Sequence, residues 1–148
     1  MTTDRCENIS FLIDDEKFNE LKKIIKIEKD AVTCRDRMGR TLLMYAAKKG
    51  NLDIVQYLID NGSDVHAKDE DSWQPIHFTA QKKNLPMVKL LLNNGANINA
   101  QHGDGGTALH KFVLDEDARE YLISKGADIN LKNFHDISPQ DTLNLLKG

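Results

Sequence analysis

The sequence predicts an all-α solenoid in which helix-turn-helix units stack side by side, are joined by β-hairpin loops and are capped at both ends. Two observations predict this fold class. The middle of the chain matches itself at an offset of 33 residues, and the apolar residues of each copy follow a helical spacing that gives way to an alternating one. Because one such unit cannot bury its own apolar faces, neighbouring copies have to stack.

The unit boundaries follow from this offset. Asp36 falls on Asp69 and Gly62 falls on Gly95 without a gap, whereas Gly126 lies only 31 residues after Gly95, so one unit is shortened. Terminal units have to turn a polar face to water, which the two ends of the chain suit. We therefore expect a single domain, residues 1–148, made of an N-terminal capping unit (1–35), repeat 1 (36–68), repeat 2 (69–101), a shortened repeat 3 (102–132) and a C-terminal capping unit (133–148).

Each full repeat contains two helix signals and one loop signal. In repeat 1, Leu43, Ala46 and Ala47 share one face of a short helix, and apolar residues within 54–59 line a second helix. Gly62 supplies the left-handed residue that ends a helix. Residues 65–68 then alternate between apolar and polar, as in an extended hairpin.

These residues resemble the ankyrin-repeat family. The family's motif is visible in 39-GRTLLMYAAKKGNLDIVQYLIDNGSDVHA-67 and in 105-GGTALH-110 with 126-GADIN-130. The resemblance is strong over residues 36–148 and weak over residues 1–35. The family's Thr-Pro-Leu-His helix start keeps both its threonine and its histidine only in repeat 3, as Thr107 and His110, and Gln74 of repeat 2 is a poor helix cap.

Composition limits the function classes. The chain has 20 Lys and Arg against 23 Asp and Glu, so it lacks the clustered positive charge of a general nucleic-acid binder. No leader-like segment is found in residues 1–13, and no run approaches a membrane span, so we expect no membrane association. Two cysteines are too few for a disulfide framework, which makes the reducing cytoplasm the default location. A protein exported without a cleavable leader would look the same.

No residue pattern indicates catalysis, a metal or a cofactor. The five histidines and the two cysteines, Cys6 and Cys34, form no ligand set with zinc spacing. No nucleophile stands with a base, and 103-GDGG-106 is no phosphate loop, so we interpret it as a flexible hairpin tip. We expect a protein that is not an enzyme and that binds no small-molecule substrate.

The resemblance to ankyrin repeats implies a concave face, formed by hairpin tips and first helices, that binds a partner protein. Trp73, the only tryptophan, shares its register with Arg40 and Gly106, a position that the fold leaves free. Aromatic and arginine side chains are enriched in binding hot spots. An alternative is that Trp73 lies flat on a neighbouring helix for packing alone. The candidate partner-binding residues are Arg37, Met38, Arg40, Tyr45, Lys48, Asp71, Trp73, Phe78, Lys82 and Lys111.

The function indicated is non-catalytic protein–protein recognition. A chain that is nearly all repeat has no second domain to act on what it binds, so we expect an inhibitor or immunity-like protein that acts by occlusion and is a monomer in isolation. The alternative is an adaptor or regulatory scaffold subunit that docks an enzyme or a transcription factor.

Overall fold

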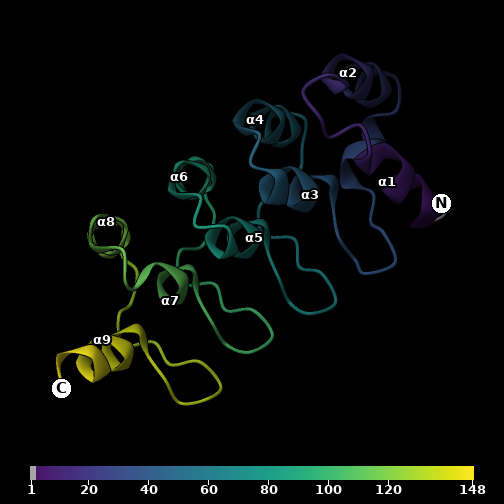
Figure 1. The fold of residues 1–148 in the computed structure, drawn as a ribbon. Coiled ribbons are helices and arrows are strands. Elements are labelled where there is room, and N and C mark those ends of the chain that lie inside the picture. Colours follow the sequence, from purple (N-terminus) through teal and green to yellow (C-terminus); the bar gives the residue numbers. More distant parts are fainter. Residues whose placement is uncertain (1–2) are drawn as a thin grey trace.

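A computed structural model describes residues 3–148. Helices follow one another along the whole of this segment (Figure 1), and within it the structure contains no β-strand. In chain order the elements are α1 (Thr3–Ser10), α2 (Phe18–Ile27), the 3-10 helix η1 (Lys29–Thr33), α3 (Leu42–Lys49), α4 (Leu52–Asp60), α5 (Pro75–Gln81), α6 (Leu85–Asn93), α7 (Ala108–Phe112), α8 (Glu116–Ser124) and α9 (Pro139–Lys147). None of these helices is long and apolar enough to cross a bilayer.

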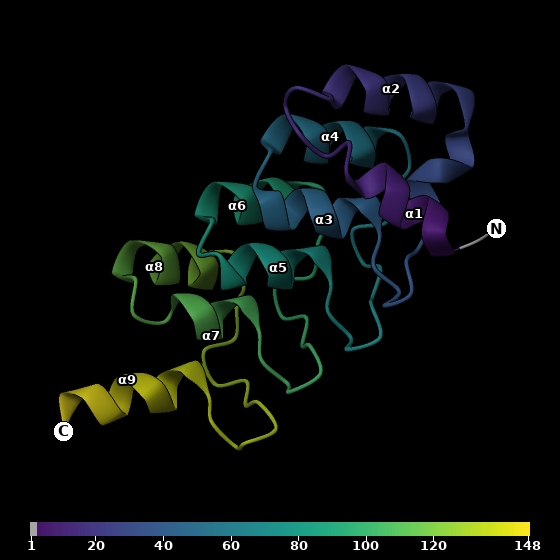
Figure 2. The same cartoon turned by 45° about the vertical axis from the view of Figure 1, so that its right-hand side comes forward.

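The helices form two rows, as the solenoid prediction requires. Figure 2 shows α1, α3, α5, α7 and α9 in an inner row and α2, α4, α6 and α8 in an outer row behind it. Four loops project from the inner row to one side, and we call them fingers 1 to 4: residues 34–41, 67–74, 100–107 and 131–138. The inner row and the fingers together border the concave side of the stack.

Side-chain caps set where the outer helices begin. The side-chain oxygens of Asn51, Asn84 and Asp115 accept hydrogen bonds from the backbone two or three residues into α4, α6 and α8, at 2.8, 3.1 and 3.0 Å. Each cap satisfies a backbone N–H that a helix start leaves without an intrahelical partner. At the other end of α4, Gly62 has a φ of 100°, which is the left-handed conformation expected from the sequence.

The core is a continuous apolar column. Leu43, Ile76 and Leu109 stand at the same register in three successive units, and each is at most 1% exposed. The units therefore bury apolar surface against one another as well as between their own two helices, which makes stability depend on neighbours. A second, smaller cluster of Met44, Ala67 and Phe78 lies apart from this column, with Trp73 packed against it.

Each finger is closed by two backbone hydrogen bonds of a tight turn and not by the strand pairing that the alternating pattern suggested. In finger 2, Asp69 N donates to the carbonyl of Trp73 at 3.0 Å, and the Asp69 carboxylate accepts from Asp71 N and Trp73 N at 3.0 and 2.8 Å. The side chain thus replaces the ladder that a strand pair would supply. Asp36 holds finger 1 in the same way.

The glycine-rich tip of finger 3 is packed, which differs from the flexible tip expected from the sequence. A Cβ atom on Gly105, whose φ is 79°, would lie 2.7 Å from the ring of Phe134 and 2.8 Å from its backbone nitrogen. Phe134 N donates to the carbonyl of Asp104 at 2.9 Å, and this bond joins finger 3 to finger 4. Glycine is therefore required here by a close approach of two fingers as well as by its backbone angle.

Cys6 of α1 and Cys34 of finger 1 form a disulfide, with 5.4 Å between their Cα atoms. This bond was not expected from the sequence, because two cysteines are too few for a disulfide framework. Cys6 is completely buried against the first repeat, so folding brings its sulfur to the small-residue position of finger 1. The bond fastens α1 to repeat 1.

Candidate functional site

The concave side contains a recess of about 240 Å³ between repeats 1 and 2. Its floor and rim come from fingers 1 and 2 and from the inner helices α3 and α5. The residues that line it are Arg40, Lys48, Asp69, Asp71, Trp73, Phe78 and Gln81.

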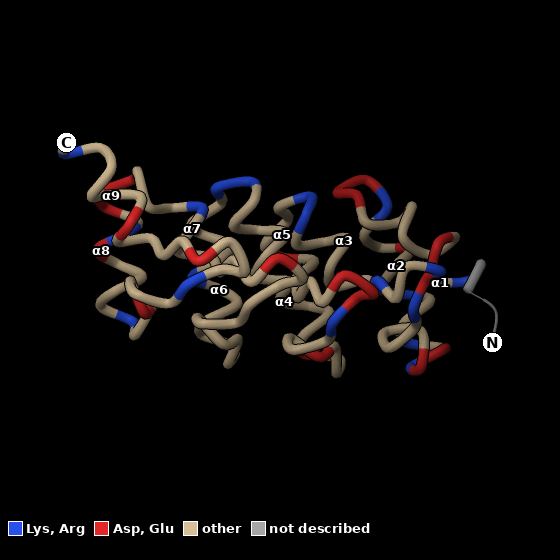
Figure 3. The backbone as a smooth tube through the Cα atoms, turned by 90° about the horizontal axis from the view of Figure 1, so that it is seen from below, with Lys and Arg blue, Asp and Glu red and all other residues tan. Residues whose placement is uncertain are grey.

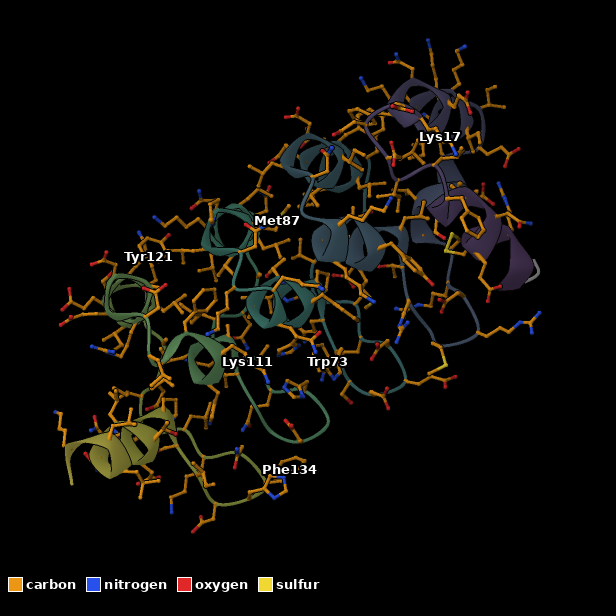
Figure 4. All side chains as sticks on the ribbon, viewed as in Figure 1. Lys17, Trp73, Met87, Lys111, Tyr121 and Phe134 are labelled. Atoms are coloured by element: carbon orange, nitrogen blue, oxygen red, sulfur yellow. A yellow bond between two sulfur atoms is a disulfide. The ribbon has the colours of Figure 1, made fainter. Side chains whose placement is uncertain are left out.

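Trp73 forms the aromatic wall of this recess. In Figure 4 its label stands between α5 and the fingers. Its ring centroid lies 5.2 Å from that of Phe78 in α5 and 4.5 Å from that of His102 in finger 3. The indole is half-buried, so one part of it is fixed by packing while another part borders the recess. Packing therefore holds part of the indole, as the alternative interpretation expected, and its role as a partner contact stays a prediction.

Asp69 and Arg40 fix the opposite wall. The Asp69 side chain is 3% exposed, and its second oxygen lies 3.7 Å from Nε of Arg40. The Arg40 guanidinium carbon in turn lies 5.9 Å from the centroid of the Phe78 ring. Because a carboxylate and an aromatic face both hold this guanidinium, it is positioned before any partner arrives.

Lys48 and Asp71 carry opposite charges on the rim. Both are exposed, and within residues 3–148 neither side chain has an ion-pair or hydrogen-bond partner. Ion pairs elsewhere in the structure, such as Lys132 with Asp136 at 2.9 Å, show that exposed lysines of this chain can find partners. The two rim charges are therefore available to groups on another molecule.

The recess unites five of the ten residues predicted as partner contacts: Arg40, Lys48, Asp71, Trp73 and Phe78. Phe78 contributes differently from the expectation, because it is only 6% exposed and supports Trp73 from below. Sequence reasoning missed Asp69. The sequence did mark this position, because Asp36 and Asp69 stand at the same register in fingers 1 and 2. A residue that recurs from repeat to repeat is more readily interpreted as structural than as a binding residue.

The other five predicted residues lie outside the recess. Arg37 is exposed at the tip of finger 1, with Nε 3.8 Å from Glu7, and Met38 beside it is 42% exposed. Tyr45 donates a hydrogen bond to Asp36, and burial together with this bond raises the pKa of Tyr45 to about 12. Tyr45 thus serves finger 1 as a donor and stays protonated.

Lys82 and Lys111, the last two of the ten, belong to a row of positive charge along one edge of the stack. Figure 3 shows Lys and Arg at the turn between α3 and α4 and at the turn between α5 and α6, with a further blue segment at α7. The turn before α2 carries acids in the same view. A partner that reaches from the recess toward this edge therefore meets lysines.

Two histidine rings stand behind the aromatic wall of the recess. His77 and His102 lie behind Trp73, with centroids 6.0 and 4.5 Å from it. Burial lowers the pKa of His77 to about 4 and also lowers the pKa of His102, so both rings are neutral at pH 7. Among the residues that the structure describes, no three His, Cys, Asp or Glu side chains are grouped to hold a metal ion.

The family model described as ankyrin repeats (3 copies) matches residues 4–69 and residues 43–133, which together cover most of the chain. The protein belongs to the ankyrin-repeat family. Ankyrin repeats are protein–protein interaction modules, so a protein-binding role follows from membership.

The curated relatives of this ankyrin-repeat protein include the 26S proteasome non-ATPase regulatory subunit 10 of Rattus norvegicus and of Homo sapiens. Each is 37% identical to it over 59 residues, which is 40% of this chain and 26% of the relative. The chain therefore matches about a quarter of the length of these relatives, and the matched part is shorter than two repeats.

Proposed function

We propose that this ankyrin-repeat protein binds another protein through its concave face, with the Trp73 recess at the centre of the contact, and that it acts as an inhibitor by occlusion. One observation carries the proposal: a half-buried tryptophan, fixed from behind, stands beside rim charges of both signs that have no partner within the described residues. Rigid aromatic anchors of this kind dominate binding energy because they lose little freedom on association.

The recess suits an arginine side chain of the partner. A guanidinium can stack on the indole face of Trp73 and pair with the exposed carboxylate of Asp71, while an acidic residue next to it in the partner would meet Lys48. Opposite charges on the rim also fix the direction in which the partner's chain crosses the recess, since the reverse orientation places like charges together.

Occlusion is the leading mechanism because residues 36–132 consist of repeats throughout. No group of catalytic or metal-binding side chains is recognised among them. A second candidate, an adaptor or regulatory subunit, is favoured by a specific observation: the matched relatives bear the name of a regulatory subunit. The two differ in what the partner does when bound. An occluded partner loses its activity, whereas a docked partner keeps it and joins a third component.

We further propose that residues 1–35 and 133–148 act as caps and that the protein is a monomer in isolation. At the N-terminal end, Ile13, Leu21 and Ile25 are at most 1% exposed within the core cluster. At the C-terminal end, Gln140 N donates to the carbonyl of Ile129 at 2.9 Å, which joins the start of α9 to repeat 3, while Leu145 and Leu146 farther along α9 are 79% and 65% exposed. Light scattering coupled to size exclusion should give one copy, and concentration-dependent growth would contradict the monomer.

A rim-charge variant tests the binding surface without disturbing the packing of Trp73. The wild-type protein and the double variant Lys48→Glu, Asp71→Lys are each immobilised as bait. The proteins that each bait captures from a lysate of the source cells are then compared. This pair keeps the net charge and the fold, because both positions are exposed and unpaired. We expect the specific partner to be lost from the variant.

The matched control is the pair Lys147→Glu and Glu120→Lys, two exposed positions on α9 and on the outer helix α8, which should capture the same partner as wild type. Equal capture by the rim variant would refute the recess as the contact. An activity assay on the purified partner then separates occlusion from docking: a partner that stays fully active in the complex refutes inhibition.

A further inference from the structure

A second cavity, of about 360 Å³, lies on the outer row, away from the concave face. It is formed where α2 and η1 meet the C-terminal half of α4. Figure 4 places α2 at the end of the outer row, with Lys17 labelled beside it. The residues that line the cavity are Lys22, Lys23, Ile25, Lys26, Lys29, Tyr57 and Asn61.

Four of these seven residues are lysines, and no carboxylate is among them. Within residues 3–148 none of the four ammonium groups has an ion-pair partner. Two of the neighbouring acids, Glu28 and Asp30, both pair with Arg5 of α1, and Glu20 of α2 is exposed one turn before Lys23. Asp60 accepts a hydrogen bond from Gln56 on the same helix.

The lysine stems and two other side chains give the cavity an apolar floor. Ile25 is 1% exposed at its base, and Nζ of Lys22 lies 4.0 Å from the ring centroid of Phe18 and 6.0 Å from that of Tyr57. These aromatic faces hold one ammonium group in place. The site therefore combines fixed positive charge at the rim with a hydrophobic base.

Four like charges around one cavity repel each other, and no carboxylate of the described residues lies within ion-pair distance of any of them. A ligand that brings carboxylates removes this repulsion and gains charge-assisted hydrogen bonds. Such a ligand has to be short. The same outer row carries exposed acids on α4 and on α8, namely Asp53, Asp60, Glu116, Asp117 and Glu120, which repel a polyanion that runs along the stack.

This charge pattern distinguishes between classes of partner. Nucleic acids and anionic membranes are matched by extended tracks or broad faces of positive charge, and the charge of this chain sums to −3. A basic cavity bounded by acids instead complements a few carboxylates with an apolar side chain between them. We propose that the lysine cavity between α2 and α4 binds a short acidic segment of a partner protein that carries an apolar residue among its carboxylates.

The test measures binding of an end-blocked fluorescent peptide, Glu-Glu-Leu-Glu-Glu, by anisotropy at low salt. The pair Lys23→Glu and Lys26→Glu should weaken binding by at least about tenfold, and the pair Lys23→Gln and Lys26→Gln by less, because neutralisation removes attraction without adding repulsion. Affinity for wild type should fall as salt increases. Thermal melts verify that the variants are folded.

The control pair, Lys125→Glu and Lys147→Glu, makes the same change in net charge outside the cavity and should bind the peptide as wild type does. An equal loss in this control would overturn the proposal, since it would reflect net charge alone. Two further outcomes would also overturn it: tighter binding of a single-stranded RNA or of anionic vesicles than of the peptide, or loss of peptide binding in the pair Lys48→Glu and Lys82→Glu. The last result would place the acidic segment at the concave edge. Failure of the concave-face proposal leaves these measurements unaffected.

Discussion

The indole of Trp73 lies 4.5 Å, centroid to centroid, from the imidazole of His102, with the two planes 31° apart. Trp73 belongs to repeat 2 and His102 to the finger of repeat 3, so this contact couples two units outside the main apolar column. Trp73, at the centre of the candidate binding surface, thereby also forms a packing contact between two repeats of the solenoid.

Replacing Trp73 by alanine should lower both stability and binding. The half-buried indole packs against Met44, Ala67 and Phe78 as well as His102, so Trp73→Ala should cost about 1–3 kcal/mol in free energy of unfolding, less than the loss of a fully buried tryptophan. Lys48→Glu, exposed on the same rim, should cost within about 0.5 kcal/mol.

Chemical denaturation of both variants measures these losses in the free energy of unfolding. The variant Ile76→Ala serves as the reference for truncation of a core side chain. Ile76 is 1% exposed in the main column, where truncation typically costs about 2–5 kcal/mol. If Trp73→Ala unfolds with the free energy of wild type, the packing around the indole contributes nothing, and Trp73 is purely a surface residue.

Stability should fall as pH is lowered from about 6.5 to about 4, because His77 is buried as a neutral ring. Gln74 N donates to Nδ1 of His77 at 2.9 Å, and Nε2 faces the carbonyl of Ala100 at 2.8 Å. A proton on Nδ1 would oppose the Gln74 donor. The folded-state pKa of His77, about 4, lies below the ordinary 6.5, so the unfolded state binds the proton first as pH falls. The free energy of unfolding should therefore decrease by up to about 3 kcal/mol over this window.

Urea unfolding at pH values across the window measures this loss. The variant His77→Met, which copies Met44 at the same position of repeat 1, removes the titrating ring. Its stability at neutral pH should be lower, because the bond to Ala100 is gone, but its dependence on pH should be weaker. An unchanged slope would assign the pH dependence to other groups, of which His102 also has a lowered pKa.

Gln74→Thr should stabilise the protein by about 1 kcal/mol, the usual contribution of a helix cap. Gln74 is 7% exposed at the start of α5, and its side-chain oxygen has no hydrogen-bond partner among the described residues. Threonine stands at this position in repeats 1 and 3, as Thr41 and Thr107, and the Thr41 hydroxyl accepts from Met44 N at 3.3 Å. Calorimetry of the variant tests the gain, and the reverse change Thr41→Gln should lose a similar amount.

Gly105→Ala and Gly62→Ala separate backbone strain from finger packing. Both glycines have positive φ, 79° and 100°, so alanine strains either position. A Cβ at Gly62 meets nothing within 4 Å, whereas one at Gly105 runs into Phe134. We expect Gly62→Ala to lower the free energy of unfolding by about 1 kcal/mol and Gly105→Ala to lower it by about 2–3 kcal/mol. Thermal unfolding measures both losses. Equal costs would show that fingers 3 and 4 yield to the added methyl group.

Reducing the Cys6–Cys34 disulfide should lower the melting temperature without unfolding the protein. The bond closes a loop between residues 28 positions apart. The restriction that such a loop places on the unfolded chain should stabilise the folded state by about 3–4 kcal/mol. The double variant Cys6→Ala, Cys34→Ala should match the reduced protein and be insensitive to reductant. If reductant leaves wild type unchanged, the bond does not contribute to stability in solution.

The repeat unit and the stack could be predicted from the sequence by itself, because both depend on local periodicity. Leu43, Ile76 and Leu109 recur at one register and have to be covered by neighbours, and asparagines and glycines at fixed positions begin and end the helices. Membership of the ankyrin-repeat family and the candidate contact residues Arg40, Lys48, Asp71 and Trp73 came from the same register.

Tertiary structure decided which of these residues meet. Trp73 reaches His102, Cys6 reaches Cys34, and Gly105 lies under Phe134, and none of these pairs follows from register alone, because each depends on how closely adjacent fingers and helices approach in space. The lysine cavity arises in the same way, since α2 and η1 supply its lysines and α4 its tyrosine, from segments that share no motif. A repeat specifies its own surface, and the distance between neighbouring surfaces is set only when the stack has formed.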